Sequence, residues 1–106
     1  MDKMEEICFG IISNVGMAKS LAIESLRDVR TNKYDEALEK IQEAENFLLE
    51  GHSFHTKLLQ EEAAGNKLDF SLILMHAEDQ LMSAETIKDL AKEMIELYKS
   101  LKQWDL

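Results

Sequence analysis

Three histidines and one aspartate are the residues of this chain whose types and spacing favour chemistry. His52 and His55 are three residues apart, and so are His76 and Asp79. On a helix, residues three apart lie on the same face, so each pair would present its two side chains in one direction. Imidazole and carboxylate groups can bind a divalent metal, and a neutral imidazole can also be a nucleophile.

Three interpretations of the histidines are open. In the first, the histidines and Asp79 together bind zinc or another divalent ion. His76 could instead attack phosphorus, with an acid or amide within one turn fixing its tautomer; the candidates are Glu78, Asp79 and Gln80. The third interpretation is ordinary structural histidines that face a core, and we expect it most for His52 and His55.

Asp79 is harder to explain as an ordinary residue, because it lies between Met75 and Met82 on an apolar stripe. A buried carboxylate without a partner is costly. If the stripe joins copies of the chain, the Asp79 carboxylates gather near the symmetry axis. Like charges in that position require protonation, water or a cation, so a central metal ion would resolve the conflict.

The composition predicts a small helical protein that does not bind nucleic acid. The chain has 106 residues, no proline and four glycines, which favours one helical domain over residues 1–106. A formal net charge of −9 disfavours binding to nucleic acid or to an anionic membrane.

The sequence also predicts a cytoplasmic location without membrane insertion. No apolar run reaches the ~18–20 residues that span a bilayer, and the first residues lack the layout of a signal peptide. The single cysteine, Cys8, cannot form an internal disulfide, and its apolar neighbours predict a buried side chain.

Apolar periodicity predicts three long helices at about residues 2–30, 33–63 and 69–102. Short connections between them indicate an all-α, antiparallel three-helix bundle. We expect Asn32 to cap the second helix, Gly65 to end it, and Asp69 or Ser71 to cap the third. Gly10 and Gly16 interrupt the first helix, and a close crossing of another backbone would explain them.

The third helix has more apolar surface than one core can cover. We expect one stripe of it to face the core; its members are Ile73, His76, Gln80, Ser83, Ile87, Leu90, Met94, Leu97, Leu101 and Trp104. A second stripe contains Leu72, Met75, Asp79 and Met82. Since a monomeric bundle buries one stripe per helix, the surplus predicts a homo-oligomer packed through the third helix.

Five segments, in order along the chain, are similar to motifs of one known family. His76-Ala77-Glu78-Asp79-Gln80-Leu81-Met82 is similar to His-x-Gln-Asp-His-Leu-Met. The others are Gly16-Met17-Ala18-Lys19-Ser20 (Gly-x-Ala-Arg-Ser), Tyr34-Asp35-Glu36-Ala37 (Asp-Phe-x-x-Ala), His52 with Thr56 and Leu59 (Ala-His-x-x-Gln-Thr-x-x-Leu), and Ile95-Glu96-Leu97-Tyr98 (Ile-Glu-Leu-Tyr). With these motifs, the whole chain resembles the lactose/cellobiose-type enzyme IIA of the bacterial phosphoenolpyruvate-dependent sugar phosphotransferase system.

The resemblance implies a homotrimer of three-helix bundles in which His76 carries phosphate. His76 would take the group from phospho-HPr and pass it to a cysteine of the cognate enzyme IIB. The membrane component IIC would then move the sugar, so the sugar is recognised by IIB and IIC. Gln80 and His52 are candidates for contacts with the phosphoryl group or the imidazole. Asp79 matches an aspartate that meets its symmetry mates around a divalent ion, for which we expect magnesium.

The chain departs from the family motifs at four positions near these residues. Glu78 stands where the family often has Gln, and Gln80 stands where it often has His. His55 replaces a usual Gln, and Lys19 replaces Arg, which keeps the charge but loses bidentate geometry. The phosphoryl acceptor is present in spite of these changes.

Two other functions compete with this interpretation. The chain could be a non-catalytic oligomeric helical adaptor with a structural metal at Asp79. A two-component histidine phosphotransfer domain is less favoured, because it usually has a lysine three residues after the histidine, where this chain has Asp79.

Overall fold

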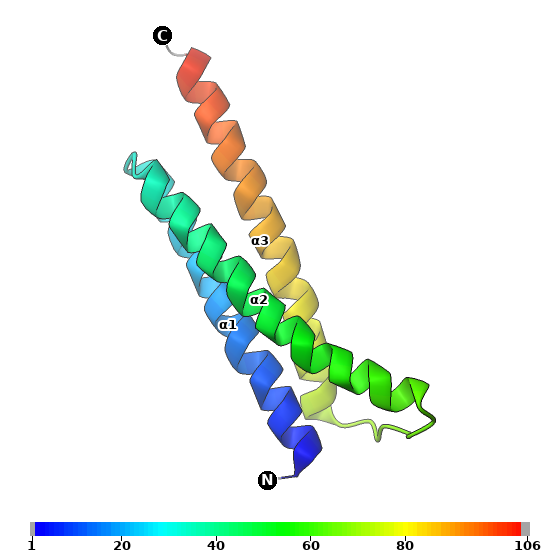
Figure 1. Cartoon of the computed structure of the whole chain (residues 1–106). Helices are drawn as coiled ribbons and strands as arrows, with labels where there is room; N and C mark the ends of the chain where they lie inside the picture. The colour runs from blue at the N-terminus through cyan, green and yellow to red at the C-terminus, as the bar shows by residue number, and fades with distance from the viewer. Residues whose placement is uncertain (1, 105–106) are drawn as a thin grey trace.

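The chain folds into three long helices, as the periodicity predicts (Figure 1). The structure, a computed structural model, describes the backbone of residues 2–104 and the side chains of residues 2–102. Within that range α1 is Lys3–Arg30, α2 is Tyr34–Ala63, α3 is Leu72–Trp104, and no strand is present. Figure 1 shows α1 and α3 starting at the same end of the molecule, with α2 running the opposite way. The described part extends over 60 × 23 × 19 Å.

The first connection differs from the prediction at its capping residue. Asn32 does not cap α2; it adopts a left-handed conformation with φ of 63°, which asparagine tolerates better than most residues. Lys33 is the N-cap instead, and it makes no side-chain capping hydrogen bond. The turn is closed by backbone bonds, including that from the N–H of Lys33 to the carbonyl of Asp28.

The second connection is longer than predicted, because α3 begins at Leu72 and not near residue 69. Gly65 follows the end of α2 with φ of +90°, the left-handed conformation expected for a glycine after a helix. Of the two capping candidates, Ser71 is the one used: its Oγ accepts a hydrogen bond from the backbone N–H of Leu74, with N···O of 3.2 Å. The helix starts where this cap satisfies the first free N–H groups.

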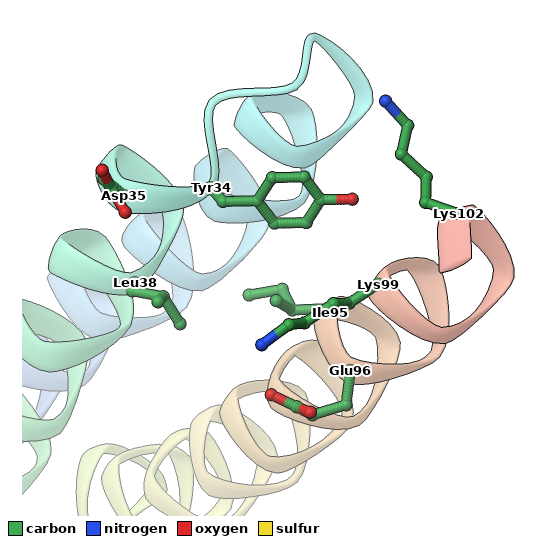
Figure 2. A pocket seen from close by; sticks show the side chains of 7 residues that line it. All are labelled: Tyr34, Asp35, Leu38, Ile95, Glu96, Lys99 and Lys102. Atoms are coloured by element: carbon green, nitrogen blue, oxygen red, sulfur yellow. The ribbon is translucent and has the colours of Figure 1, made fainter. Parts of the chain in front are cut away.

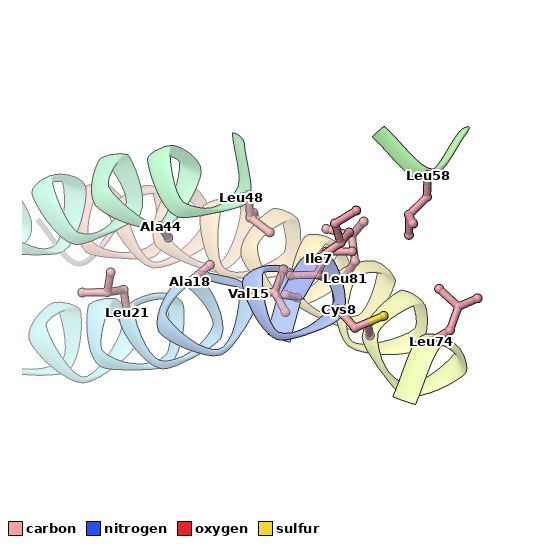
Figure 3. Packing of buried hydrophobic residues seen from close by; sticks show 13 residues of the cluster. Ile7, Cys8, Val15, Ala18, Leu21, Ala44, Leu48, Leu58, Leu74 and Leu81 are labelled. Carbon is pink, nitrogen blue, oxygen red and sulfur yellow. The ribbon is translucent and has the colours of Figure 1, made fainter. Parts of the chain in front are cut away.

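Two apolar clusters form the core, and small residues let the helices approach closely. The cluster near the start of α1 and α3 is shown in Figure 3. It contains Ile7, Cys8, Ile11, Val15, Ala18, Leu21, Ala44, Leu48, Leu58, Leu74, Ala77, Leu81 and Ala84. The second cluster, toward the other end, contains Ala22, Val29, Ala37, Ile41, Ala91 and Ile95. Buried alanines from all three helices therefore set the helix spacing.

The face that α3 buries is not the predicted one. The buried residues are Leu74, Ala77, Leu81, Ala84, Ala91 and Ile95. The predicted stripe lies beside them: Ile73, Gln80, Ser83 and Ile87 are partly buried, while His76, Leu90, Met94, Leu97 and Leu101 are exposed. The side chain of Trp104, also placed on that stripe, lies outside the described side chains. The prediction was wrong because it favoured large apolar residues, whereas alanines occupy the closest contacts.

The sequence predicted that a crossing backbone would explain the two glycines of α1, and this was wrong, because neither glycine faces one. A Cβ on Gly10 would lie 2.7 Å from the ring of Phe54, so this glycine makes room for a side chain of α2. A Cβ on Gly16 would meet no atom within 4 Å. Nothing in the fold explains Gly16.

The length and composition of α1 would also suit a membrane span, and it is the one helix in the described part for which this is so. The sequence had led us to expect no such span. Nine residues of α1 are buried inside the bundle, and the core helix of a soluble protein has the same composition. Packing against α2 and α3 therefore accounts for its apolar character.

Candidate functional site

His76 lies on the second turn of α3, and its side chain is exposed. The sequence predicted that it points toward the core, and this was wrong. Its neighbour Ala77 is fully buried, so α3 turns Ala77 inward and His76 outward. Among the described residues, no side chain makes a hydrogen bond or an ion pair with the His76 ring. The imidazole is therefore open to a reacting partner.

Gln80 joins this part of α3 to α1. The Nζ of Lys19, on α1, donates a hydrogen bond to Oε1 of Gln80 at 3.2 Å, and both side chains are partly buried. Gln80 is four residues after His76, so the two lie one turn apart on the same side of the helix, about 6 Å along its axis. Gln80 therefore contacts Lys19 of α1, and the exposed His76 lies one turn before Gln80 on α3.

His52 and His55 lie on the opposite side of α3, where α2 packs. His55 Nδ1 is 2.8 Å from Oε1 of Glu78, and His52 Nε2 contacts Oε1 of Glu85. Glu78 is two residues after His76, which places it about 200° around the helix. The contact with Glu78 puts His55 at nearly the same height along α3 as His76, but on a different side of that helix.

Within one chain, His52 therefore does not stand beside His76, although the sequence made it a candidate contact. Glu85, its partner, is nine residues after His76, which is about 13 Å along α3 and half a turn around it. Among the described residues, no group of three or more His, Cys, Asp or Glu side chains could hold a metal ion. The interpretation of the histidines as an intramolecular metal site is therefore wrong.

Cys8 is a core residue, as predicted. Its side chain is fully buried in the first cluster, and burial together with the charge of Glu78 raises the pKa of the thiol. A thiol in this state has little thiolate at neutral pH and is a poor nucleophile. Cys8 is therefore not a candidate nucleophile.

Asp79 lies on the outer face of α3 and is exposed, as are Met75 and Met82 on either side of it. The exposed apolar residues continue along the whole helix: Leu72, Met75, Met82, Leu90, Met94, Leu97 and Leu101. We call these seven residues, with Asp79, the outer stripe. Within one chain, no described residue covers this stripe, and the Asp79 carboxylate is exposed to solvent.

A groove of about 560 Å³ lies at the other end of the bundle (Figure 2). Its lining residues come from the start of α2 and the end of α3: Tyr34, Asp35, Leu38, Ile95, Glu96, Lys99 and Lys102. Ile95 is nineteen residues after His76, which is about 28 Å along α3. The groove is therefore separate from the His76 region.

Sequence comparison decides the family of this chain. A model of the family described as "PTS system, Lactose/Cellobiose specific IIA subunit" matches residues 6–99. The oligo-beta-mannoside-specific EIIA component of Bacillus subtilis strain 168 is 45% identical over 96 residues, covering 91% of this chain and 87% of that protein. The chain belongs to the lactose/cellobiose-specific IIA family of the phosphotransferase system. The resemblance found in the five motifs is thereby confirmed.

Solved structures of IIA proteins agree with this fold over nearly the whole chain. The PTS cellobiose-specific enzyme IIA from Bacillus anthracis has a TM-score of 0.94 and 44% identity, covering 97% of this chain and 94% of that one. A IIA(chitobiose)–HPr complex of the N,N'-diacetylchitobiose branch of the Escherichia coli phosphotransferase system has a TM-score of 0.82 and 33% identity, covering 96% and 99%. IIA proteins are soluble phosphotransfer components of sugar transport, and this general role extends to the chain.

Sequence reasoning underrated one residue of the site. Lys19 entered only as a departure from the family motif, whereas the structure brings it to Gln80, one turn from His76. The apolar periodicity of α1 could have indicated this contact. Ala18 and Ala22 lie on the buried face of α1, and Lys19 lies at the edge of that face. A lysine at the edge of a buried face is positioned to reach a neighbouring helix.

Proposed function

We propose that this IIA protein is a cytoplasmic phosphocarrier in which His76 accepts a phosphoryl group from phospho-HPr and passes it to a cysteine of the cognate enzyme IIB. The membrane component IIC is an indirect partner. The observation that carries this assignment is a difference in hydrogen bonding among the three histidines. His52 and His55 are each bonded to a glutamate, whereas the exposed His76 has no side-chain partner in the described part of the chain.

An unpartnered imidazole suits the chemistry of both transfers. In the first, a lone pair on a His76 nitrogen attacks phosphorus, and the bond between phosphorus and the donor atom of HPr breaks with its electrons returning to HPr. In the second, the IIB thiolate attacks the same phosphorus, an S–P bond forms, and the electrons of the N–P bond return to His76. Both displacements require in-line approach to phosphorus, which an exposed side chain allows.

The partners of His76 are proteins in this proposal. The E. coli IIA(chitobiose)–HPr complex supports HPr as the donor, because its IIA fold matches this chain over 96% of its length. Exposure of His76 on a helix surface supports direct contact with another protein. Partner side chains and Gln80 would supply hydrogen bonds to the phosphoryl oxygens as charge develops on them.

The outer stripe supports assembly as a homotrimer around α3. Met75 and Met82 are 59% and 64% exposed on either side of Asp79, and a continuous apolar stripe of this length favours burial against other copies. Three chains would bring three Asp79 carboxylates together, although no single chain holds a metal cluster in its described part. Carboxylate oxygens suit a divalent ion such as magnesium, which would neutralise their repulsion.

Replacement of the acceptor tests the proposed function. His76→Ala should reduce labelling by phosphoenolpyruvate, enzyme I and HPr to the background level, because the nucleophile is lost. Gln80→Ala should slow labelling without abolishing it. His55→Ala is the matched control, since it removes a histidine that is bonded to Glu78, and it should be labelled fully.

The labelled protein should carry one acid-labile phosphoryl group, and peptide mapping should place it on His76. Circular dichroism would check that each variant keeps its helical content. Full labelling of folded His76→Ala, or a phosphoryl group mapped to His52 or His55, would contradict the assignment.

A further inference from the structure

Lys19 differs from three lysines that pair with carboxylates between or along the helices. Lys40 bonds to Asp28 at 2.8 Å, Lys88 to Asp89 at 2.6 Å and Lys92 to Glu45 at 3.0 Å. Lys19 instead donates to the neutral amide of Gln80, and no carboxylate pairs with it among the described residues. A half-buried cation that bonds only to an amide keeps its charge for another anion.

Lys102 also donates to a neutral amide, that of Asn32, but Lys102 is exposed, whereas Lys19 is partly buried. The sequence has 21 Asp and Glu residues against 12 Lys and Arg, so carboxylate partners are abundant. Partial burial of Lys19 removes some of its water, and an amide oxygen compensates less well than a carboxylate does. An anion bound beside Lys19 would therefore stabilise it more than it would stabilise a solvated lysine.

The position of Lys19 relative to His76 points to one particular anion. Gln80, which holds the Lys19 ammonium, is one turn after His76 on the same side of α3. A phosphoryl group on His76 would extend beyond the imidazole, into space that a lysine side chain held one turn away is long enough to reach. The glutamate nearest in sequence, Glu78, is bonded to His55 on the other side of the helix, so it leaves this space free of its charge.

We propose that Lys19 binds the phosphoryl oxygens carried on His76, and that Gln80 holds the Lys19 ammonium in place before the group arrives. This inference rests on the proposed function of His76. Lys19 contributes in two ways: its charge stabilises the phosphoryl group in transfer, and its contact lowers the free energy of the phosphorylated form. The neutral Gln80 side chain can hold Lys19 without cancelling its charge, as a carboxylate in the same place would do.

Phosphoryl transfer by lysine variants tests this assignment. Lys19→Met keeps the length of the apolar stem and removes the charge, so the single-turnover rate of transfer from phospho-HPr should fall about 100-fold. Lys19→Arg should restore most of the rate, because it retains a cation with several donors. Lys99→Met removes the same charge near the far end of α3 and should transfer at the rate of the unaltered protein.

A second measurement separates phosphate binding from a merely structural role. The rate of hydrolysis and the ³¹P chemical shift of phosphorylated His76 should change in Lys19→Met and not in Lys99→Met. Lower thermal stability of Lys19→Met with an unchanged transfer rate, hydrolysis rate and ³¹P shift would overturn the proposal. The inclusion of His76→Ala keeps the two hypotheses distinct: labelled His76→Ala refutes the proposed function, whereas unlabelled His76→Ala with fast Lys19→Met refutes only the role of Lys19.

Discussion

At the scale of single residues, neighbours in sequence have different tasks because α3 turns about 100° per residue. Gln80 contacts α1, Glu78 contacts α2, and Asp79 lies on the outer stripe beside the exposed His76. A polar cluster that looks continuous in sequence is therefore divided among three sides of one helix. This division turns the carboxylate of Glu78 toward His55 and away from His76, although Glu78 is only two residues from His76 in sequence.

The candidate acceptor could be predicted from the sequence, but its surroundings could not. His76 stood out because an apolar run contains a single histidine, and the family motif pointed to the same residue. The sequence did not show that His52 and His55 are bonded to glutamates, because those contacts depend on how α2 and α3 are rotated about their axes. The contact of Lys19 with Gln80 joins residues 61 positions apart and was hidden for the same reason.

The two helical glycines of α1 provide a matched pair of substitutions. Gly16→Ala should stabilise the protein by about 0.5–1 kcal/mol, because alanine favours the helix and the new Cβ meets nothing within 4 Å. For a domain of this size that corresponds to roughly 2–8 °C in Tm. Gly10→Ala should lack this gain, because its Cβ would lie 2.7 Å from the Phe54 ring and the ring must move.

Thermal unfolding followed by circular dichroism measures the difference between these variants at equal protein concentration. The double substitution Gly10→Ala with Phe54→Leu should recover part of the helix-propensity gain, since the six-membered ring is then absent. A Gly10→Ala variant as stable as Gly16→Ala would show that Phe54 moves without cost.

At the scale of helices, length and direction could be predicted, whereas the buried face of α3 could not. Periodicity gives the bounds of α1 and α2 to within one residue, because each has one apolar side. On α3 apolar residues occur almost all the way round, so periodicity does not single out one face. The seven-residue spacing of Ala77, Ala84 and Ala91 was the available signal, since all three are buried where α3 lies close to its neighbours.

The start of α3 gives a prediction at this scale. Ser71→Ala should destabilise the protein by about 1 kcal/mol, because the N–H of Leu74 loses its hydrogen bond to Ser71 Oγ. Asp69→Ala should change the free energy of unfolding by less than about 0.5 kcal/mol, because Asp69 is exposed and precedes the cap. Urea unfolding of both variants measures this difference.

A further variant, Ser71→Asp, serves as the control, because aspartate also accepts a hydrogen bond at an N-cap and suits the positive end of the helix dipole. Its stability should equal or exceed that of the unaltered protein. A larger loss for Asp69→Ala than for Ser71→Ala would mean that α3 begins earlier in solution.

At the scale of the whole molecule, the bundle covers its core but leaves the outer stripe of α3 in solvent. The most exposed apolar side chain of that stripe is Leu72, at its start, which is 84% exposed. The sequence predicted surplus apolar surface on this helix, and the structure contains it, although on a wider stretch than residues 72–82. Self-association is the expected consequence, because burial of about 25 cal/mol per Å² of apolar surface favours contact with other copies.

Light scattering tests this assembly with one substitution on the stripe and one away from it. The unaltered protein should have about three times the chain mass of 12.2 kDa, whereas Met82→Lys should give monomers because it places a charge in the interface. Met17→Lys makes the same change on an exposed methionine of α1, which lies about 200° around that helix from Lys19 and hence from α3. Met17→Lys should keep the trimer mass.

Asp79 makes the proposed metal testable in the same experiment. A chelator should lower the stability of the trimer, because three clustered carboxylates then repel one another without a cation. Asp79→Asn keeps the shape of the side chain and removes the charge, so its trimer should be insensitive to the chelator and to added magnesium. Equal sensitivity of the two proteins to the chelator would show that the trimer does not depend on a metal at Asp79. A monomeric mass of the unaltered protein at micromolar concentration would refute assembly through the outer stripe.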